Sequence, residues 1–194
     1  QWYLHADVEK LRDTTMGKKI ISEVTKEYGQ KLAEAENFLG FDLIRDITDL
    51  SLFGNGKKDS AAIIIQGEIN RRHLEDMIVD ADKYQTNLYQ GETIHSWQDK
   101  GKDQNAAFHG DSLVVVSEKP ELIMLTLDVL AERKPHLESV KALPGSSVMM
   151  GTVNIDALDL PVDQGSKMVK KAKSLIASIS EVDDRLRADF LIET

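Results

Sequence analysis

The chain contains no cysteine and no long apolar run, and each absence excludes a class of protein. Without Cys there can be no disulfide, no thiol nucleophile and no thiolate metal ligand. The longest apolar stretches, at 61–65 and 113–116, have the length of a strand, whereas a transmembrane helix needs about 18 or more apolar residues. The sequence therefore predicts no integral membrane segment. Four prolines and 12 glycines are also too few for a low-complexity linker protein.

Composition fits a soluble globular protein. The 194 residues are 41% hydrophobic and 29% charged, which is too apolar for disorder and leaves enough interior for a core. One domain or two small ones are possible at this length. The formal net charge of −9 argues against general binding to nucleic acid or to anionic membranes.

Hydrophobic periodicity in the first half predicts a ferredoxin-like unit over residues 1–89. Trp2, Leu4, Ala6 and Val8 alternate with polar residues, which is typical of a half-buried strand. An amphipathic helix follows with three- and four-residue spacing until Gly40. The expected elements, in β-α-β-β-α-β order, are a strand at 2–8, a helix at 16–39, strands at 47–53 and 61–66, a helix capped by Asn70, and a strand at 84–89.

The second half, 90–194, is predicted to be a related or permuted unit that shares or extends the same sheet. Gly-containing links favour an antiparallel meander of strands at 84–89, 92–98, 105–109 and 112–116, with a polar loop at 99–104. The remaining expected elements are helices at 120–133, 136–143 and 166–180 and strands at 146–153 and 186–192. We expect the last strand to pair with 146–153 and the natural chain to continue beyond residue 194. The fold class is thus α+β, an antiparallel sheet with helices on one side.

Two phrases resemble segments of exported bacterial proteins of unknown function. They are Trp-Tyr-Leu-His-Ala-Asp-Val at 2–8 and Asp-Ile-Thr-Asp-Leu-Ser-Leu-Phe-Gly at 46–54. The resemblance covers the first half, includes no catalytic motif, and implies a periplasmic or secreted location. The start at Gln1 without a Met also suggests that a signal peptide has been removed, and a cytoplasmic location is the alternative.

The sharpest candidates for chemistry are His5, Asp7, His95 and His109. Two His and a carboxylate could ligate Zn²⁺ or a similar ion. The rings at 95 and 109 oppose each other only if the hairpin register sums to 204, and a slip of one places them on opposite sheet faces. No compact His spacing of known zinc motifs is present, so the sequence favours a solvated sheet face with no metal and no cofactor.

Three functional hypotheses follow. The leading one is a non-catalytic exported domain that binds a partner protein or ligand through the sheet or its edge. A protein partner or a second copy could bind through the sheet edge or the 120–133 helix. The alternative is a metal-dependent or hydrolytic enzyme that uses the His/Asp cluster. No Gly-x-Ser-x-Gly motif occurs, although a Ser-His-Asp triad can be assembled in space without a local signature. A structural repeat of a larger assembly is the third.

Overall fold

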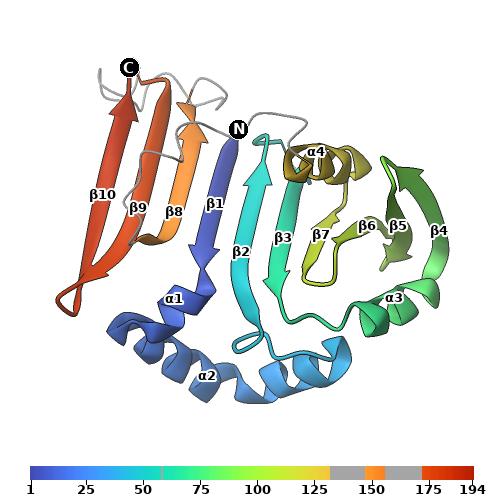
Figure 1. Ribbon diagram of the computed structural model, residues 1–194, viewed down its shortest axis with the longest axis horizontal. Coiled ribbons are helices and arrows are strands. Elements are labelled where there is room, and N and C mark those ends of the chain that lie inside the picture. Colours follow the sequence, from blue (N-terminus) through green and yellow to red (C-terminus); the bar gives the residue numbers. More distant parts are fainter. Residues whose placement is uncertain (58, 132–146, 156–171) are drawn as a thin grey trace.

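The computed structural model describes residues 1–57, 59–131, 147–155 and 172–194, and its fold is α+β (Figure 1). All of its described strands form one ten-stranded sheet in which every neighbouring pair is antiparallel. The order across the sheet is β10-β9-β8-β1-β2-β3-β7-β6-β5-β4. The strands are β1 Trp2–Asp7, β2 Ile47–Gly54, β3 Ala61–Gly67, β4 Asp82–Tyr89, β5 Glu92–Asp99, β6 Lys102–His109, β7 Leu113–Ser117, β8 Ser147–Asn154, β9 Ser174–Val182 and β10 Arg185–Glu193.

The helices begin and end where the sequence places capping residues. In α1 (Val8–Asp13) the Asp7 carboxylate accepts the backbone N–H of Lys10. The long helix α2 (Thr15–Leu39) ends at Gly40 in the left-handed conformation, with φ +78°. In α3 (Arg71–Val79) Asn70 is the N-cap, as predicted, and α4 (Pro120–Leu130) has proline in its first turn.

The ferredoxin-like pairing predicted for residues 1–89 is not confirmed. The β-α-β-β-α-β order exists along the chain, but the unit needs a parallel β-α-β crossover. Here α1 and α2 run below the ends of the central strands and return the chain antiparallel, so that β1 lies between β2 and β8 (Figure 1). β4 lies at the far edge, separated from β3 by the rest of the meander. The division at residue 89 stays a prediction, since one sheet contains strands from both halves.

The meander of β4 to β7 confirms the predicted antiparallel hairpins. The polar loop expected at 99–104 is shorter, because Lys100 and Gly101 both adopt positive φ, 51° and 80°, and form a two-residue turn. β6 therefore starts at Lys102, and β5 pairs with it as His95 opposite Ala106.

The prediction of helices on one side of the sheet is wrong. On one face, Ile123 and Leu127 of α4 pack in a cluster with Ala107 and Val115. On the other face, α3 packs against a cluster that contains Phe108 and Val114. The central strands are consequently buried on both faces, which explains the unbroken apolar runs in β6 and β7.

The C-terminal part also departs from the prediction. Residues 174–180, expected in a helix, form β9, and the last strand pairs with β9 instead of with β8. A two-residue turn at Asp183 and Asp184, both at positive φ, closes this hairpin. The predicted helix at 136–143 and the start of that at 166–180 lie outside the described residues.

Candidate functional site

The predicted site residues do not come together. His5 and Asp7 lie on the sheet face that carries α4, and His95 lies on the opposite face. The residue numbers of paired positions in β5 and β6 sum to 201 and not to 204, so His95 and His109 do not face each other. His109 shares the face of His5 but lies on β6, four strands away. Among the described residues, no three His, Asp or Glu side chains are grouped as a metal site.

Asp7 serves helix α1 rather than a ligand. Besides capping the helix, its carboxylate forms an ion pair with Lys10 Nζ at 2.7 Å. Partial burial acts to raise the pKa of Asp7, but the hydrogen bonds and charge of Lys10 outweigh it and lower the pKa overall. The residue is therefore a charged cap at neutral pH.

His5 takes part in a small polar cluster with two neighbours on β2. Its Nδ1 lies 2.9 Å from Ser51 Oγ, and its Nε2 lies 3.7 Å from Asp49 Oδ1. The Tyr3 hydroxyl is 3.3 Å from the same Ser51 oxygen. Serine, histidine and aspartate are the residue types of a hydrolytic triad, but the Asp49 carboxylate is beyond hydrogen-bond distance of the His5 ring. Sequence reasoning missed Ser51 and Asp49, because the β1–β2 register is set across a connection of nearly 40 residues.

His95 occupies a second and more buried cluster. It is 7% exposed, its Nδ1 lies 3.0 Å from the Tyr84 hydroxyl, and its ring meets Phe108 edge-on. Glu75 of α3 approaches its Nε2 at 3.9 Å and is itself paired with Arg71. Burial lowers the pKa of His95; Glu75 opposes this shift and Arg71 adds to it. The ring is thus a neutral, packed side chain at neutral pH.

His109 lies beside Glu92 of the neighbouring strand β5, with its Nδ1 3.0 Å from Glu92 Oε1. The two residues lie on paired strands at the rim of the sheet.

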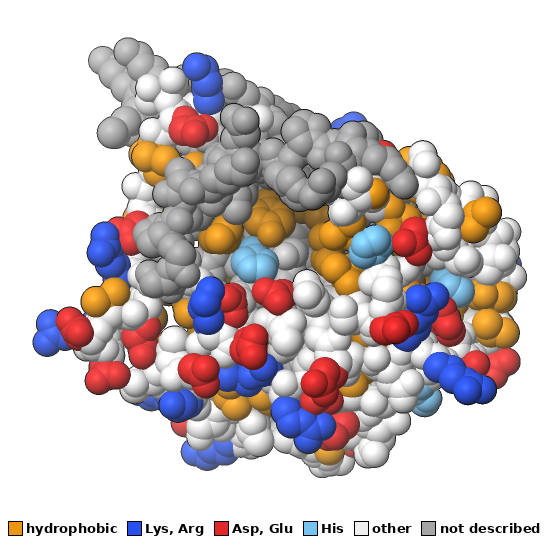
Figure 2. Space-filling view, in the orientation of Figure 1, with side chains coloured by type: hydrophobic (Ala, Val, Ile, Leu, Met, Phe, Trp, Pro, Cys, Tyr) orange, Lys and Arg blue, Asp and Glu red, His pale blue; other side chains and the backbone are white. Residues whose placement is uncertain are grey.

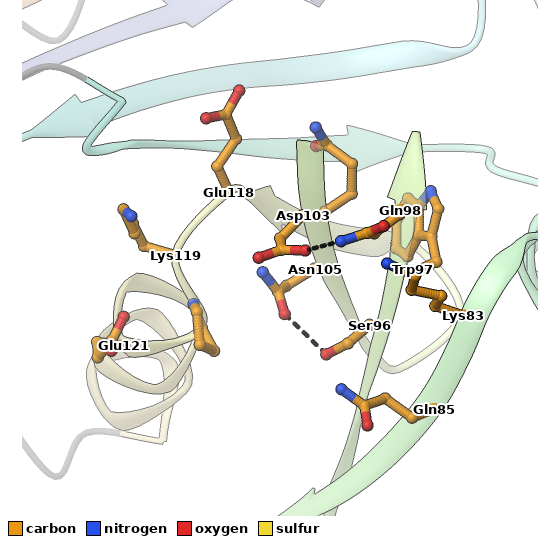
Figure 3. Close-up of a pocket in the computed structure, with 12 residues that line it drawn as sticks. Lys83, Gln85, Ser96, Trp97, Gln98, Asp103, Asn105, Glu118, Lys119 and Glu121 are labelled. Atoms are coloured by element: carbon orange, nitrogen blue, oxygen red, sulfur yellow. Dashed lines mark hydrogen bonds between the residues drawn. The ribbon is translucent and has the colours of Figure 1, made fainter. Parts of the chain in front are cut away.

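A polar groove of about 500 Å³ lies between the start of α4 and strands β4 to β6 (Figure 3). Four of its side chains are paired across β5 and β6: Ser96 donates to Asn105 at 2.7 Å, and Gln98 donates to Asp103 at 2.8 Å. Asn105 in turn donates to the Ser117 carbonyl oxygen at 3.2 Å. The groove is lined by acidic, basic and amide side chains together, so its charge favours no single class of ligand.

An apolar surface lies on the reverse face of β10, β9, β8, β1, β2 and β3, opposite the face that carries α4. We call it the open apolar face. The strand registers place one set of apolar side chains on it, and each of these side chains is half-buried or exposed. They are Trp2, Leu4, Ala6, Leu50, Leu52, Ile63, Met149, Val153, Leu175, Ala177, Ile179, Leu186, Ala188, Phe190 and Ile192.

The α4-bearing face of the molecule has a different character. Acidic and basic side chains are interspersed over its lower half, and hydrophobic side chains gather above them, towards the middle of the view (Figure 2). On the same strands that carry the open apolar face, this side buries Val148, Thr152 and Ile176. The two faces of this half of the sheet therefore differ both in how deeply their side chains are buried and in composition.

Helix α2 begins beside the open apolar face and is fixed at its two ends. Glu181, on that face of β9, accepts the backbone N–H groups of Thr15 and Met16 at 2.8 and 2.9 Å. At the other end the Phe38 carbonyl oxygen lies 2.8 Å from His73 Nε2. Gly17 is the one buried residue of the helix, and Ile20 and Tyr28 of its apolar stripe are exposed. None of the described helices is long and apolar enough to span a membrane.

These features define the class as an α+β protein with a single large antiparallel sheet. No family model matches the chain, and no curated protein matches it. The chain is similar in fold to two crystal structures of TP0453. Form IV has a TM-score of 0.55 at 11% identity over 97% of this chain and 74% of that one. Form III has a TM-score of 0.55 at 12% identity over 98% and 74%. At this identity the similarity shows the fold alone, and no characterised family is established.

Proposed function

We propose that this chain is a non-catalytic binding domain that holds a partner protein against its open apolar face. The observation that supports it most is the inverted burial of β9. Ser178 and Ser180 are each 2% exposed, whereas Leu175, Ala177 and Ile179 on the other face are not buried. A strand normally buries its apolar face, so a large uncovered apolar face marks an interaction surface.

The size of this face favours a macromolecule. Six strands spaced about 4.8 Å apart give a width of roughly 25 Å, and a similar length gives a footprint on the order of 600 Å². A standard protein interface buries about 800 Å² of accessible surface per partner. Small molecules are held in concave pockets, while this face is spread across six strands. We infer a partner that presents an apolar face of its own, and we keep the periplasmic or secreted location as part of the proposal.

Charge placed in the centre of the face provides the test. The variant Leu4→Asp/Ile63→Asp puts two carboxylates on neighbouring parts of the open apolar face, both at side chains that are already 38% exposed. The matched control is Leu88→Asp, at an exposed leucine on β4 at the far edge of the sheet. Folding of each variant is checked by circular dichroism and urea unfolding.

Partners are captured by cross-linking in extracts of the native host, and each is then purified and titrated against the chain. The proposal expects a partner that binds the wild type and the Leu88 variant equally and binds the double variant at least tenfold more weakly. It is wrong if every purified partner binds the double variant as tightly as it binds the wild type.

The His5 cluster supports a second candidate, a hydrolase with Ser51 as nucleophile and His5 as general base. The 2.9 Å separation between Ser51 Oγ and His5 Nδ1 is the observation that favours it. A fluorophosphonate probe that labels the wild type but not Ser51→Ala or His5→Ala would support this candidate. Absence of labelling, which we expect because Asp49 does not reach the ring, would leave the binding function.

A further inference from the structure

The two edges of the sheet are built differently. At the β4 edge the register shifts between Asp82 and Gln85, and Lys83 adopts a positive φ of 55°. A bulge and a charged residue are devices that protect a sheet edge from pairing with another chain. At the other edge, β10 pairs with β9 over nine consecutive residues with no shift. Eight of the nine residues of β10 are exposed, among them Phe190 at 70%.

Among the described strands β10 has a neighbour on one side only, so every second residue of its backbone directs its hydrogen-bonding groups away from the sheet. Hydrogen-bonded and non-bonded pairs alternate along an antiparallel ladder, starting from the pair that closes the two-residue turn, Arg185 with Val182. Odd-numbered residues therefore direct their N–H and C=O groups towards β9. The Glu193 carbonyl oxygen has this direction, since it accepts the N–H of Lys173, the residue that precedes β9, at 2.7 Å. Even-numbered residues, with Ala188 at the centre, direct theirs to the open edge.

The charges along β10 are complementary to those of a second β10 strand that runs antiparallel to it. On the α4-bearing face the order is Arg185, Arg187, Asp189, so positive charge precedes negative charge. Antiparallel self-pairing about Ala188 places Arg187 opposite the Asp189 of a second copy, twice. Because Arg187 already contacts Asp189 of its own strand at 2.9 Å, the four side chains would alternate in sign around a square.

Other registers are less favourable. A centre at Asp189 or at Arg187 sets identical charges directly opposite each other, which destabilises a strand pair. A centre at Phe190 would use Glu193 as the partner of Arg187, but the Glu193 carboxylate is already bound by the Ser174 hydroxyl. The centre at Ala188 also sets Leu186 opposite Phe190 in both directions.

We infer that β10 pairs antiparallel with β10 of a second copy of this chain, centred on Ala188, and joins two sheets into one. This pairing uses the edge only and leaves the open apolar face available. It therefore stands independently of the proposed function, and Leu4→Asp/Ile63→Asp is expected to remain dimeric.

The chain has no cysteine, so one introduced cysteine reports the register directly. Opposite Cα atoms in a hydrogen-bonded pair are about 5.5 Å apart, a distance that a disulfide bridges. Ala188→Cys is expected to form a dimer that is sensitive to reductant under mild oxidation. Phe190→Cys, which faces Leu186 of the partner in this register, is expected to cross-link much less. Preferential cross-linking of Phe190→Cys would overturn the Ala188-centred register.

Charge reversal tests the same contact in the absence of a cross-link. The wild type should be a dimer by light scattering, and Asp189→Arg should raise the dimer dissociation constant at least about tenfold, since it sets like charges opposite each other. Arg187→Asp/Asp189→Arg should restore the dimer, because it exchanges the charges and keeps the pattern. Ala188→Pro should be monomeric yet folded, since it removes an N–H that faces the open edge and not β9. A monomeric wild type, or a double swap that fails to restore dimers, would refute the inference.

Discussion

Two glycines near α2 should respond in opposite directions to the same substitution. Gly40 ends the helix at φ +78°, and a Cβ added there would lie 2.9 Å from His73 Cδ2. The left-handed conformation costs an L-residue roughly 1–2 kcal/mol. Displacing the His73 ring would also weaken its hydrogen bond to the Phe38 carbonyl, worth about 0.5–1.5 kcal/mol. Gly40→Ala should therefore lower the free energy of unfolding by about 2–3 kcal/mol.

Gly29 is the matched control, in the interior of the same helix. The nearest atom to an added Cβ there is Thr25 Cγ2, at 4.0 Å, so alanine fits without strain. Gly29→Ala should raise the free energy of unfolding by about 0.5–1 kcal/mol, because glycine is the more flexible residue in the unfolded chain. Both shifts are measured by urea unfolding, and an unchanged m-value shows that the change is one of stability.

A double-mutant cycle separates the two contributions at Gly40. In a His73→Ala background the ring contact is absent, and Gly40→Ala should cost only the conformational share of about 1–2 kcal/mol. If Gly40→Ala and Gly29→Ala shift stability in the same direction, the argument from backbone conformation is wrong.

Three further predictions concern single side chains. Leu127→Ala should lower the free energy of unfolding by about 2–5 kcal/mol, because this side chain is 2% exposed between α4 and the sheet; a loss below about 1 kcal/mol in urea would contradict its burial. Because burial lowers the pKa of His95, the unfolded state takes up the proton first as pH falls. Stability should thus drop below about pH 6.5 in the wild type and drop less in His95→Gln, as measured by urea unfolding across the pH range. Glu181→Gln should weaken the N-terminal anchor of α2, and hydrogen exchange at Thr15 and Met16 should accelerate while that at Leu39 does not.

Local chemistry made much of the fold predictable. The capping roles of Asn70, Pro120 and Gly40 and the hairpins of the meander depend on residues that are near one another in sequence, and all are confirmed. The position of β1 beside β8 depends on a contact across nearly 150 residues, which no local pattern encodes. The same limit explains the ferredoxin-like interpretation, since the order of elements along the chain does not determine the order of strands in the sheet.

The candidate site was less predictable, because it depends on register. A turn of two residues at Lys100 and Gly101, instead of a longer loop, decides that His95 and His109 lie on opposite faces. A lysine at positive φ is not a turn signal that composition reveals. Likewise, Ser51 lies beside His5 only because β1 and β2 pair in one particular register.

The wrong prediction of a helix at 174–180, where the structure has β9, bears directly on the proposed function. Leu175, Ile176 and Ile179 fit the stripe of an amphipathic helix, and the same segment alternates as a strand with serines on one side. As a strand, it buries Ser178 and Ser180 and leaves Leu175 and Ile179 partly open. As a helix or as a strand, this segment has an apolar side that normally packs against another apolar surface. Among the described residues no element packs over Leu175 and Ile179 on that face. The partner proposed above would supply such a surface.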